Sequence, residues 1–263
     1  MIGSEYVKLT LDKNIAVITI DNPPMNPLSD GVLAGLKEAL DALDALDKVE
    51  DVRALVITGA GEKSFVAGAD IKEFTAWTAE SAVDLTARGQ RLFQRIENFP
   101  APVIAAINGY ALGGGLELAL CADIRVVSKS AKMGLPEVGL GIIPGYGGTQ
   151  RLIRAINIGQ AKKLIYTGAC VSAEKALELG LVQDVVEPDL LMDFVLELAT
   201  GIAKNAPIAV RCAKSAINAI PNSEMPFGLS VELQASATVF SSKDRVEGVN
   251  AFIEKRKPVF QNQ

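Results

Sequence analysis

Two glutamates stand alone in apolar, glycine-rich stretches of the sequence. Glu117 follows three glycines in NGYALGGGLELAL, residues 108–120, and Glu137 is the sole acid in MGLPEVGLGIIPGYGGTQRL, residues 133–152. A carboxyl group in apolar surroundings has its pKa raised by desolvation, so it can exchange a proton near neutral pH. Two such carboxyls in one site typically divide the roles of acid and base. The pattern therefore indicates proton-transfer chemistry shared by Glu117 and Glu137.

Both acids also have a structural interpretation without chemistry. Acids are common near the start of a helix, where the helix dipole favours negative charge, so Glu117 is alternatively a surface residue. Glu137 is alternatively a loop acid that pairs with Arg151 or Arg154. The apolar neighbours of Glu117 leave few polar faces for a solvated side chain, which favours the chemical interpretation.

The glycines before Glu117 suggest a second component of a site. Glycine lets a backbone approach a ligand closely, and the first amides of a helix have no partner within it, so they can donate to a negative oxygen. Glu117 lies three residues after Gly114, which places it within roughly 60° of the same helical face. A further glycine turn, SFVAGADIKEF at 64–74, offers amides at the end of a predicted sheet, although Asp70 there is alternatively a helix cap.

The composition narrows the chemistry. The 263 residues include no histidine, which excludes Ser-His and Cys-His dyads and removes the commonest metal ligand. The net charge of −5 argues against nucleic acid and anionic membranes as partners. Three distant cysteines are typical of a reducing compartment, and the start of the chain lacks a signal-like pattern. We therefore expect a cytoplasmic protein without a metal. The cysteines are Cys121, Cys170 and Cys212.

Three glycine-rich segments resemble nucleotide-binding motifs and depart from them at one position each. TGAGEKSF, residues 58–65, has Glu62 where a phosphate-binding loop requires glycine before the lysine. In GLGIIPG and GYGGTQ, Pro144 and Gln150 stand where the dinucleotide fingerprint has its third glycine. These departures argue against nucleotide hydrolysis and nicotinamide chemistry.

The elements that position the acids alternate between strands and helices. We predict two strands within residues 7–20, a helix capped by Ser29, a buried strand within 51–61 and a helix over 79–97. Residues 98–116 are uncharged, but their prolines, asparagines and glycines favour a buried strand and turn over a membrane span. Another short helix and strand follow. This alternation is typical of an α/β domain with largely parallel sheets.

From about residue 190 the strand patterns fade and helical patterns with interspersed prolines remain. We therefore predict a core α/β domain over residues 1–190 that carries the active site, and a helical C-terminal region over residues 191–263.

Four blocks of sequence, in family order and spacing, together resemble the enoyl-CoA hydratase (crotonase) family. They are AGADIKEF, PVIAAINGYALGGGLELALCADIR, GLPEVGLGIIPGYGGTQRL and the tail AFIEKRKPVF. The resemblance covers most of the chain. It implies a crotonase-like fold, a spiral of ββα units with a helical C-terminal region that trimerises, commonly into a hexamer of two stacked trimers.

The resemblance also implies a role for each matching residue. The amides of Ala69 and Gly114 would form an oxyanion hole for the thioester oxygen. Glu117 would act as the base toward water and Glu137 as the proton donor to Cα. The implied substrate-binding and CoA-binding positions are Ala67, Ala69, Asp70, Ile71 and Lys72, with Ala67 and Asp70 near the adenine, and Phe252 and Lys255, which would reach the CoA of a neighbouring subunit.

Lys255, Arg256 and Lys257 form a compact basic group in the tail that would suit a CoA phosphate. The alternative is a solvated helix end, where cations are common.

The implied activity is the addition of water across the 2,3 double bond of an enoyl-CoA, giving a 3-hydroxyacyl-CoA, in fatty acid β-oxidation or related acyl-CoA metabolism. No metal or redox cofactor is needed, because coenzyme A enters as part of the substrate. Alternatives are an isomerase, hydrolase or decarboxylase of the same family, and an acyl-CoA binder without catalysis. RNA binding, known for some relatives, is disfavoured by the acidic balance.

Two departures from the family pattern leave the exact substrate open. Leu135 stands where many hydratases of the family have glutamine, and the loop NPPMNPLS, residues 22–29, is shorter than usual. We expect Phe74 and Trp77 to shape the acyl end of the pocket.

Overall fold

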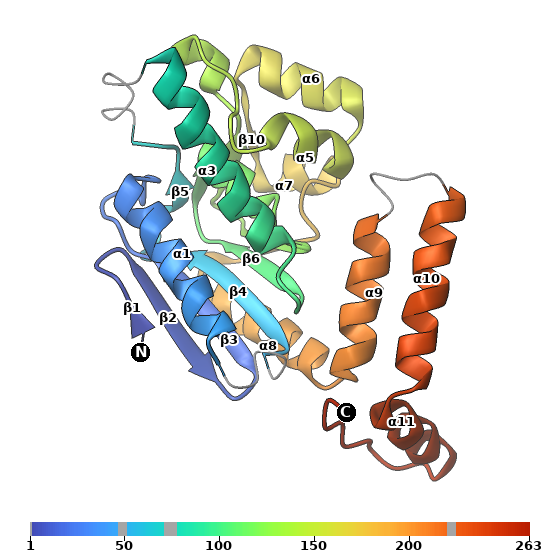
Figure 1. Cartoon of the computed structure of the whole chain (residues 1–263). Coiled ribbons are helices and arrows are strands. Elements are labelled where there is room, and N and C mark those ends of the chain that lie inside the picture. The colour runs from blue at the N-terminus through green and yellow to red at the C-terminus, as the bar shows by residue number, and fades with distance from the viewer. Residues whose placement is uncertain (1, 47–51, 71–77, 220–224) are drawn as a thin grey trace.

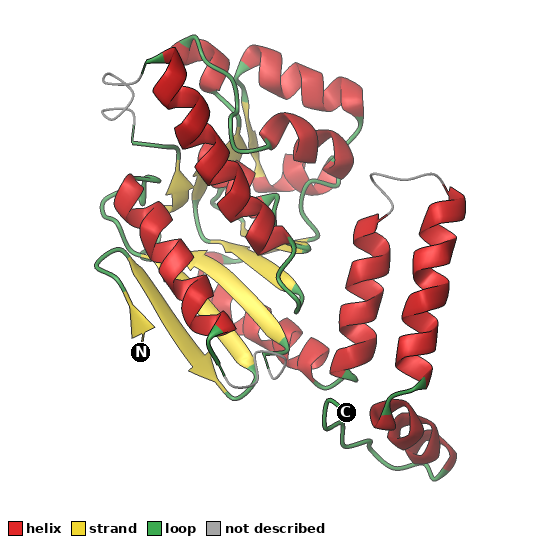
Figure 2. Cartoon of the chain, viewed as in Figure 1, coloured by secondary structure: helices red, strands yellow, loops and turns green. Residues whose placement is uncertain are grey.

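Two β-sheets and the helices packed on them form the body of the computed structural model, and the last helices extend away from it (Figure 1 and Figure 2). The structure describes residues 2–46, 52–70, 78–219 and 225–263. The large sheet has seven strands and the small sheet has four.

The large sheet is parallel over most of its width, as the sequence predicts. The first three strands are antiparallel to one another, and each pairing from β3 to β11 is parallel. In spatial order its strands are β1 (Ile2–Gly3), β2 (Val7–Asp12), β3 (Ile15–Ile20), β4 (Ala54–Gly59), β6 (Val103–Ile107), β8 (Ile124–Ser128) and β11 (Asp184–Val186).

The small sheet consists of strands of three or four residues. In spatial order they are β10 (Cys170–Ser172), β9 (Lys132–Gly134), β7 (Tyr110–Leu112) and β5 (Ser64–Ala67). Ser64–Ala67 is therefore a strand in its own right, and the AGAD turn follows it.

The chain alternates between the two sheets and returns through helices. It runs from β4 to β5 and then α3 (Ala79–Glu97), and from β6 to β7 and then α4 (Gly114–Ala119). This order is the ββα repeat expected from the resemblance. After β8 and β9 come a 3-10 turn and the short helices α5 (Gly148–Ala155), α6 (Ile158–Thr167) and α7 (Ala173–Glu178).

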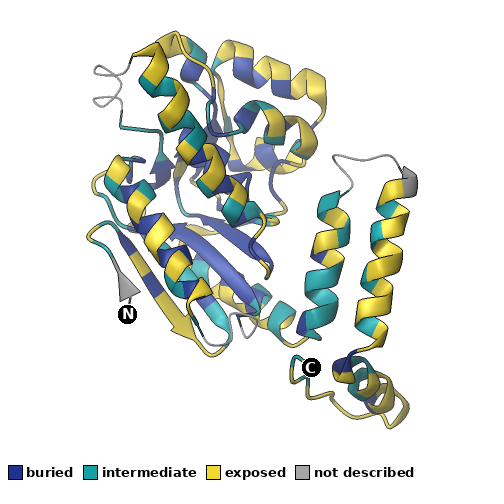
Figure 3. Cartoon of the chain, in the orientation of Figure 1, coloured by how far each residue is buried: buried dark blue, intermediate teal, exposed yellow. Residues whose placement is uncertain are grey.

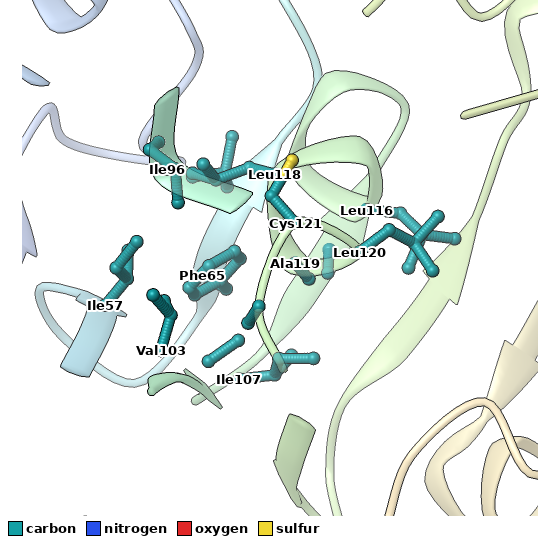
Figure 4. Close-up of a cluster of buried hydrophobic side chains, with 14 of the residues drawn as sticks. Ile57, Phe65, Ile96, Val103, Ile107, Leu116, Leu118, Ala119, Leu120 and Cys121 are labelled. Atoms are coloured by element: carbon teal, nitrogen blue, oxygen red, sulfur yellow. The ribbon is translucent and has the colours of Figure 1, made fainter. Parts of the chain in front are cut away.

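The central strands β4 and β6 of the large sheet are buried on both faces, which explains why they read as continuous apolar runs. Leu55 and Ile57 face the main core, whereas Ala54 and Val56 pack against α8 (Leu191–Ala203). The main core also encloses α4 (Figure 4). Its labelled side chains are Ile57, Phe65, Ile96, Val103, Ile107, Leu116, Leu118, Ala119, Leu120 and Cys121. The core therefore holds α4 rigidly at the junction of the two sheets.

Several predicted elements appear with the expected bounds. Ser29 accepts a hydrogen bond from the Val32 amide and caps α1 (Asp30–Asp44), and α3 covers the predicted residues 79–97. The uncharged segment 98–116 contains the predicted buried strand β6, and the turn after it leads into a second short strand, β7, and the start of α4. Among the described residues, no helix is long and apolar enough to cross a membrane.

The C-terminal helices α9 (Pro207–Ala219), α10 (Met225–Phe240) and α11 (Lys243–Ile253) extend from the body (Figure 1). Most of α9 is half-buried, whereas α10 is largely exposed (Figure 3). An ion pair between a buried lysine and a partly exposed aspartate ties α9 to the body. Lys214 Nζ lies 2.8 Å from Asp123 Oδ2 and donates to the Ala101 carbonyl oxygen at 3.0 Å.

Candidate active site

Glu117 and Glu137 line one cavity of about 1390 Å³. Ala69 and Gly114 line the same cavity, so the structure brings together all four residues assigned to proton transfer and to the oxyanion hole. Its walls are the first turns of α3, the ends of β5 and β7, the start of α4 and the loop between Gly139 and Gln150.

Glycines allow α4 to begin against this cavity. Gly113, which precedes the helix, has a φ of 54°, a conformation that favours glycine. A Cβ on Gly115 would lie 1.9 Å from the Val66 carbonyl oxygen, so only glycine lets α4 pack this closely on β5. These contacts place Glu117 on the first turn of α4, where its side chain meets the cavity.

The Glu117 carboxyl is buried and held by two backbone donors. Its residue is 2% exposed, which excludes the surface-acid interpretation. Oε1 accepts hydrogen bonds from the Tyr146 amide at 2.8 Å and the Gly148 amide at 2.7 Å. Burial raises the pKa of Glu117 to about 7, the two amides oppose that rise, and the nearby charge of Glu137 adds to it. The group can therefore gain or lose a proton near neutral pH.

Glu137 opens a 3-10 turn (Glu137–Leu140) and is 8% exposed. Burial raises the pKa of its carboxyl as well. Its Oε2 is buried and has no hydrogen-bond partner among the described residues. Arg151 does not pair with it, because that guanidinium binds Glu97 instead. Leu135, fully buried in the core, provides no polar support.

Among the described residues, the amides of Ala69 and Gly114 have no hydrogen-bond acceptor. Gly114 is the first residue of α4, so its amide has no acceptor within the helix. Beside Ala69, the Gly68 carbonyl accepts from the Leu28 amide and the Asp70 amide donates to the Leu28 carbonyl. Successive amides of an extended chain point to opposite sides, so the Ala69 amide points away from Leu28. Both donors belong to residues of the cavity wall.

The loop at residues 22–29 supports this turn, a role that sequence analysis did not detect. Asn26 is 3% exposed, and its Nδ2 donates to the carbonyl oxygens of Ala60 and Ser64. The loop also pairs with the strand end, since the Ala67 amide donates to the Met25 carbonyl. The only signal in the sequence was an asparagine among prolines, a pattern that turns share widely.

Tyr146 is a second residue that the sequence did not single out. Its ring is mostly buried in the cavity wall and packs edge-to-face on Phe93 with centroids 5.3 Å apart. A Cβ on Gly89 would lie 2.3 Å from this ring, so a glycine in α3 makes room for it.

The remaining predicted substrate-binding residues divide into three groups. Ala67 lines the cavity, and Asp70 follows directly after the wall residue Ala69. Ile71, Lys72, Phe74 and Trp77 lie outside the described residues. Phe252 and Lys255 lie at and just beyond the end of α11, and neither residue lines this cavity.

The basic group in the tail is partly neutralised. Arg256 forms ion pairs with Glu247 and Glu254. The nearby Phe252 side chain is 86% exposed.

Comparisons with known proteins find relatives that match almost the whole chain. A family model described as enoyl-CoA hydratase/isomerase matches residues 10–263. The chain is 44% identical to a crotonyl-CoA hydratase of Syntrophomonas wolfei over 97% of this chain and 98% of that one. It is also 44% identical to a short-chain-enoyl-CoA hydratase of Clostridium acetobutylicum over 95% of both chains. A crystal structure of an enoyl-CoA hydratase from Bacillus anthracis superposes with a TM-score of 0.93 at 42% identity, covering 98% of this chain and all of that one.

Proposed function

The chain belongs to the enoyl-CoA hydratase/isomerase family, and we propose that it is an enoyl-CoA hydratase that works through Glu117, Glu137 and the amides of Ala69 and Gly114. The observation that carries the proposal is that two buried carboxyls and two backbone donors line one cavity. An isomerase of the family manages with one acid, so the presence of both favours hydration.

Hydration builds negative charge on the thioester oxygen as water adds to the conjugated double bond. The Ala69 and Gly114 amides stabilise that charge as an enolate forms, and losing one such donor typically costs about 2.7 to 4 kcal/mol. The water oxygen bonds to Cβ and its proton passes to the Glu117 carboxylate. The Glu137 carboxyl gives its proton to Cα. One water is added, and the two acids exchange protonation states before the next turnover.

The hydrogen bonds support this division of roles. Two amides donate to Glu117 Oε1 and stabilise its ionised form, which is the form that acts as a base. Glu137 Oε2 receives no such donor among the described residues, so burial favours the neutral, proton-donating form of that group.

The protein is further proposed to be a homo-oligomer, a hexamer built as a dimer of trimers, in which Phe252 and Lys255 complete a neighbour's CoA site. The support is the protruding C-terminal region and its exposed apolar side chains. They include Phe227, Leu233, Phe240, Phe252 and Ile253.

A place in fatty acid metabolism follows from the substrate class. A cytoplasmic location is supported by the three free cysteines, which suit a reducing compartment.

The proposal is tested by incubating the purified protein with crotonyl-CoA. We expect loss of the conjugated-thioester absorbance and formation of 3-hydroxybutyryl-CoA with one oxygen from ¹⁸O-labelled water. Release of free CoA would instead identify a hydrolase, conversion of 3-butenoyl-CoA without hydration an isomerase, and binding without turnover a non-catalytic protein. A series of enoyl-CoA substrates from C4 to C16 then defines the acyl length.

A further inference from the structure

The turn that holds Glu117 is itself held from behind by a side chain. Tyr146 and Gly148 donate their amides to Glu117, and the carbonyl oxygen of Tyr146 accepts a hydrogen bond from Arg151 Nη1 at 2.8 Å. The Gly147 carbonyl accepts from the Arg151 backbone amide at 2.9 Å. Arg151 therefore contacts the turn through its side chain and also through the first backbone hydrogen bond of α5.

Arg151 is fixed in turn by α3. Its Nε and Nη2 both donate to Glu97 Oε2, at 3.1 and 2.8 Å, and its side chain is 10% exposed. Gly147 has a φ of 109°, and a Cβ there would lie 2.1 Å from Arg151 Nη1. The glycine thus leaves space for the guanidinium against the turn. Gln90, also on α3, donates to the Gly145 carbonyl at 2.8 Å and holds the other end of the turn.

We propose that Arg151, anchored by Glu97, is a positioning residue for the reaction: it fixes the turn whose two amides orient the Glu117 carboxylate. This inference rests on the proposed hydratase function and extends it to two residues that do not themselves touch the substrate site.

An arginine suits this role because its planar guanidinium donates to the carbonyl and to the carboxylate at the same time. A lysine carries the same charge but has a single ammonium at one point, so it reaches only one of the two acceptors well. The Arg151→Lys substitution therefore separates the effect of the positive charge from the effect of the two hydrogen bonds.

The charge of Arg151 also favours the ionised form of Glu117, because its nearness lowers the pKa of that carboxyl. Three other titratable residues, on the elements that pack around Glu117, affect its environment. Glu137 raises its pKa, Glu97 partly neutralises Arg151, and the buried Cys121 thiol donates to the Glu117 carbonyl.

The experiment compares Arg151→Met, Arg151→Lys and a matched control, Arg95→Met. Arg95 lies in the last turn of α3 and pairs with Asp41 and Asp44 of α1, so the control removes two ion pairs of the helix that carries Glu97, and none of these residues lines the cavity. Steady-state hydration of crotonyl-CoA gives kcat and KM. The infrared carboxyl band that disappears in Glu117→Gln reports the titration of Glu117 without any turnover.

For Arg151→Met we expect kcat to fall at least about tenfold with KM within about twofold, since small misplacements of a catalytic group are costly. The Glu117 titration moves to higher pH. Arg151→Lys restores most of the titration but not kcat, and Arg95→Met changes neither. Wild-type kcat and titration in folded Arg151→Met would overturn the inference, as would full recovery of kcat in Arg151→Lys.

Glu97→Gln provides a second test that does not disturb Arg151 itself. The guanidinium keeps its charge but loses its anchor, so kcat falls while the Glu117 titration moves to lower pH. Wild-type kcat in Glu97→Gln would also overturn the inference. If Arg151→Met does not fold, the kcat of Glu97→Gln serves as the test instead. If the wild-type protein fails to hydrate crotonyl-CoA, the proposed function fails, whereas the infrared shifts still test the contact between Arg151 and the Glu117 turn.

Discussion

The Glu137 carboxyl packs directly against the backbone of Gly113. A Cβ built on Gly113 would lie 2.9 Å from Glu137 Oε1. Gly113 also accepts the hydrogen bond of the Glu117 amide at 3.0 Å through its carbonyl oxygen. One glycine therefore leaves room for the carboxyl of one acid and accepts the backbone hydrogen bond of the other.

Substituting Gly113 is expected to disturb catalysis through Glu137. In Gly113→Ala the added methyl group meets the carboxyl, and the φ of 54° is unfavourable for alanine. We expect kcat for crotonyl-CoA to fall by at least about tenfold. Gly61→Ala is the matched control, since Gly61 also has a positive φ but nothing within 4 Å of the added Cβ. Equal kcat values in the two variants would contradict the contact.

The raised pKa of Glu117 predicts an acidic limb in the pH dependence of the rate. The base must be ionised, and burial raises its pKa to about 7. We therefore expect log(kcat/KM) to fall with a slope of about one as the pH drops below about 7. The measurement is initial hydration rates from pH 5.5 to 9, with recovery of activity at pH 8 as the control for unfolding. A flat profile down to pH 5.5 would exclude Glu117 as the base.

The same pKa predicts that Glu117 destabilises the protein at high pH. Its pKa rises from 4.5 to about 7 on burial, so its contribution to stability is complete below pH 4.5 and is lost as the pH rises through about 7. That shift corresponds to roughly 3 kcal/mol. Glu117→Gln does not titrate and keeps an oxygen for both amides.

In urea unfolding, Glu117→Gln is expected to be more stable than the wild type at pH 8, and the difference is expected to shrink toward pH 5. The exposed Glu62→Gln serves as the control. A difference that is the same at both pH values would contradict the buried, titrating carboxyl.

The ion pair between the buried Lys214 and the partly exposed Asp123 predicts where the C-terminal region is attached. Lys214→Met leaves the Asp123 carboxylate without its partner, although Val103 still donates its amide to that group. We expect a loss of roughly 2 to 3 kcal/mol in the free energy of unfolding, because a quarter-exposed partner is less costly than a fully buried one. Lys204→Met, at the exposed end of α8, is the control. Unchanged stability in Lys214→Met would show that this pair does not tie α9 to the body.

The elements with long periodic patterns were predictable from the sequence. Helix α3 spans the predicted residues, and Ser29 caps α1, because capping and apolar spacing are local signals. The burial of the two acids at one cavity was also predictable, since a lone carboxyl in an apolar glycine-rich run has few structural uses.

The small sheet and the partners of the acids were not predictable in the same way. Strands of three or four residues are too short to show alternation, and they pair with segments far away in the chain. The amides that hold Glu117 come from residues 29 and 31 positions further on. Such contacts depend on tertiary packing, which a local pattern does not contain. The ββα repeat was hidden for the same reason, because its units share an order of elements rather than a sequence.

The most direct test of the two-acid site is the turnover of crotonyl-CoA by Glu117→Gln and Glu137→Gln, with binding of the saturated analogue butyryl-CoA as the measure of an intact cavity. Glutamine matches the shape of glutamate but neither accepts nor delivers a proton at these pH values. We predict that kcat falls by at least about 100-fold in each variant while butyryl-CoA binding stays within a few fold, because general acid-base catalysis contributes about 10² to 10⁴. Near-wild-type turnover in either folded variant would contradict the account.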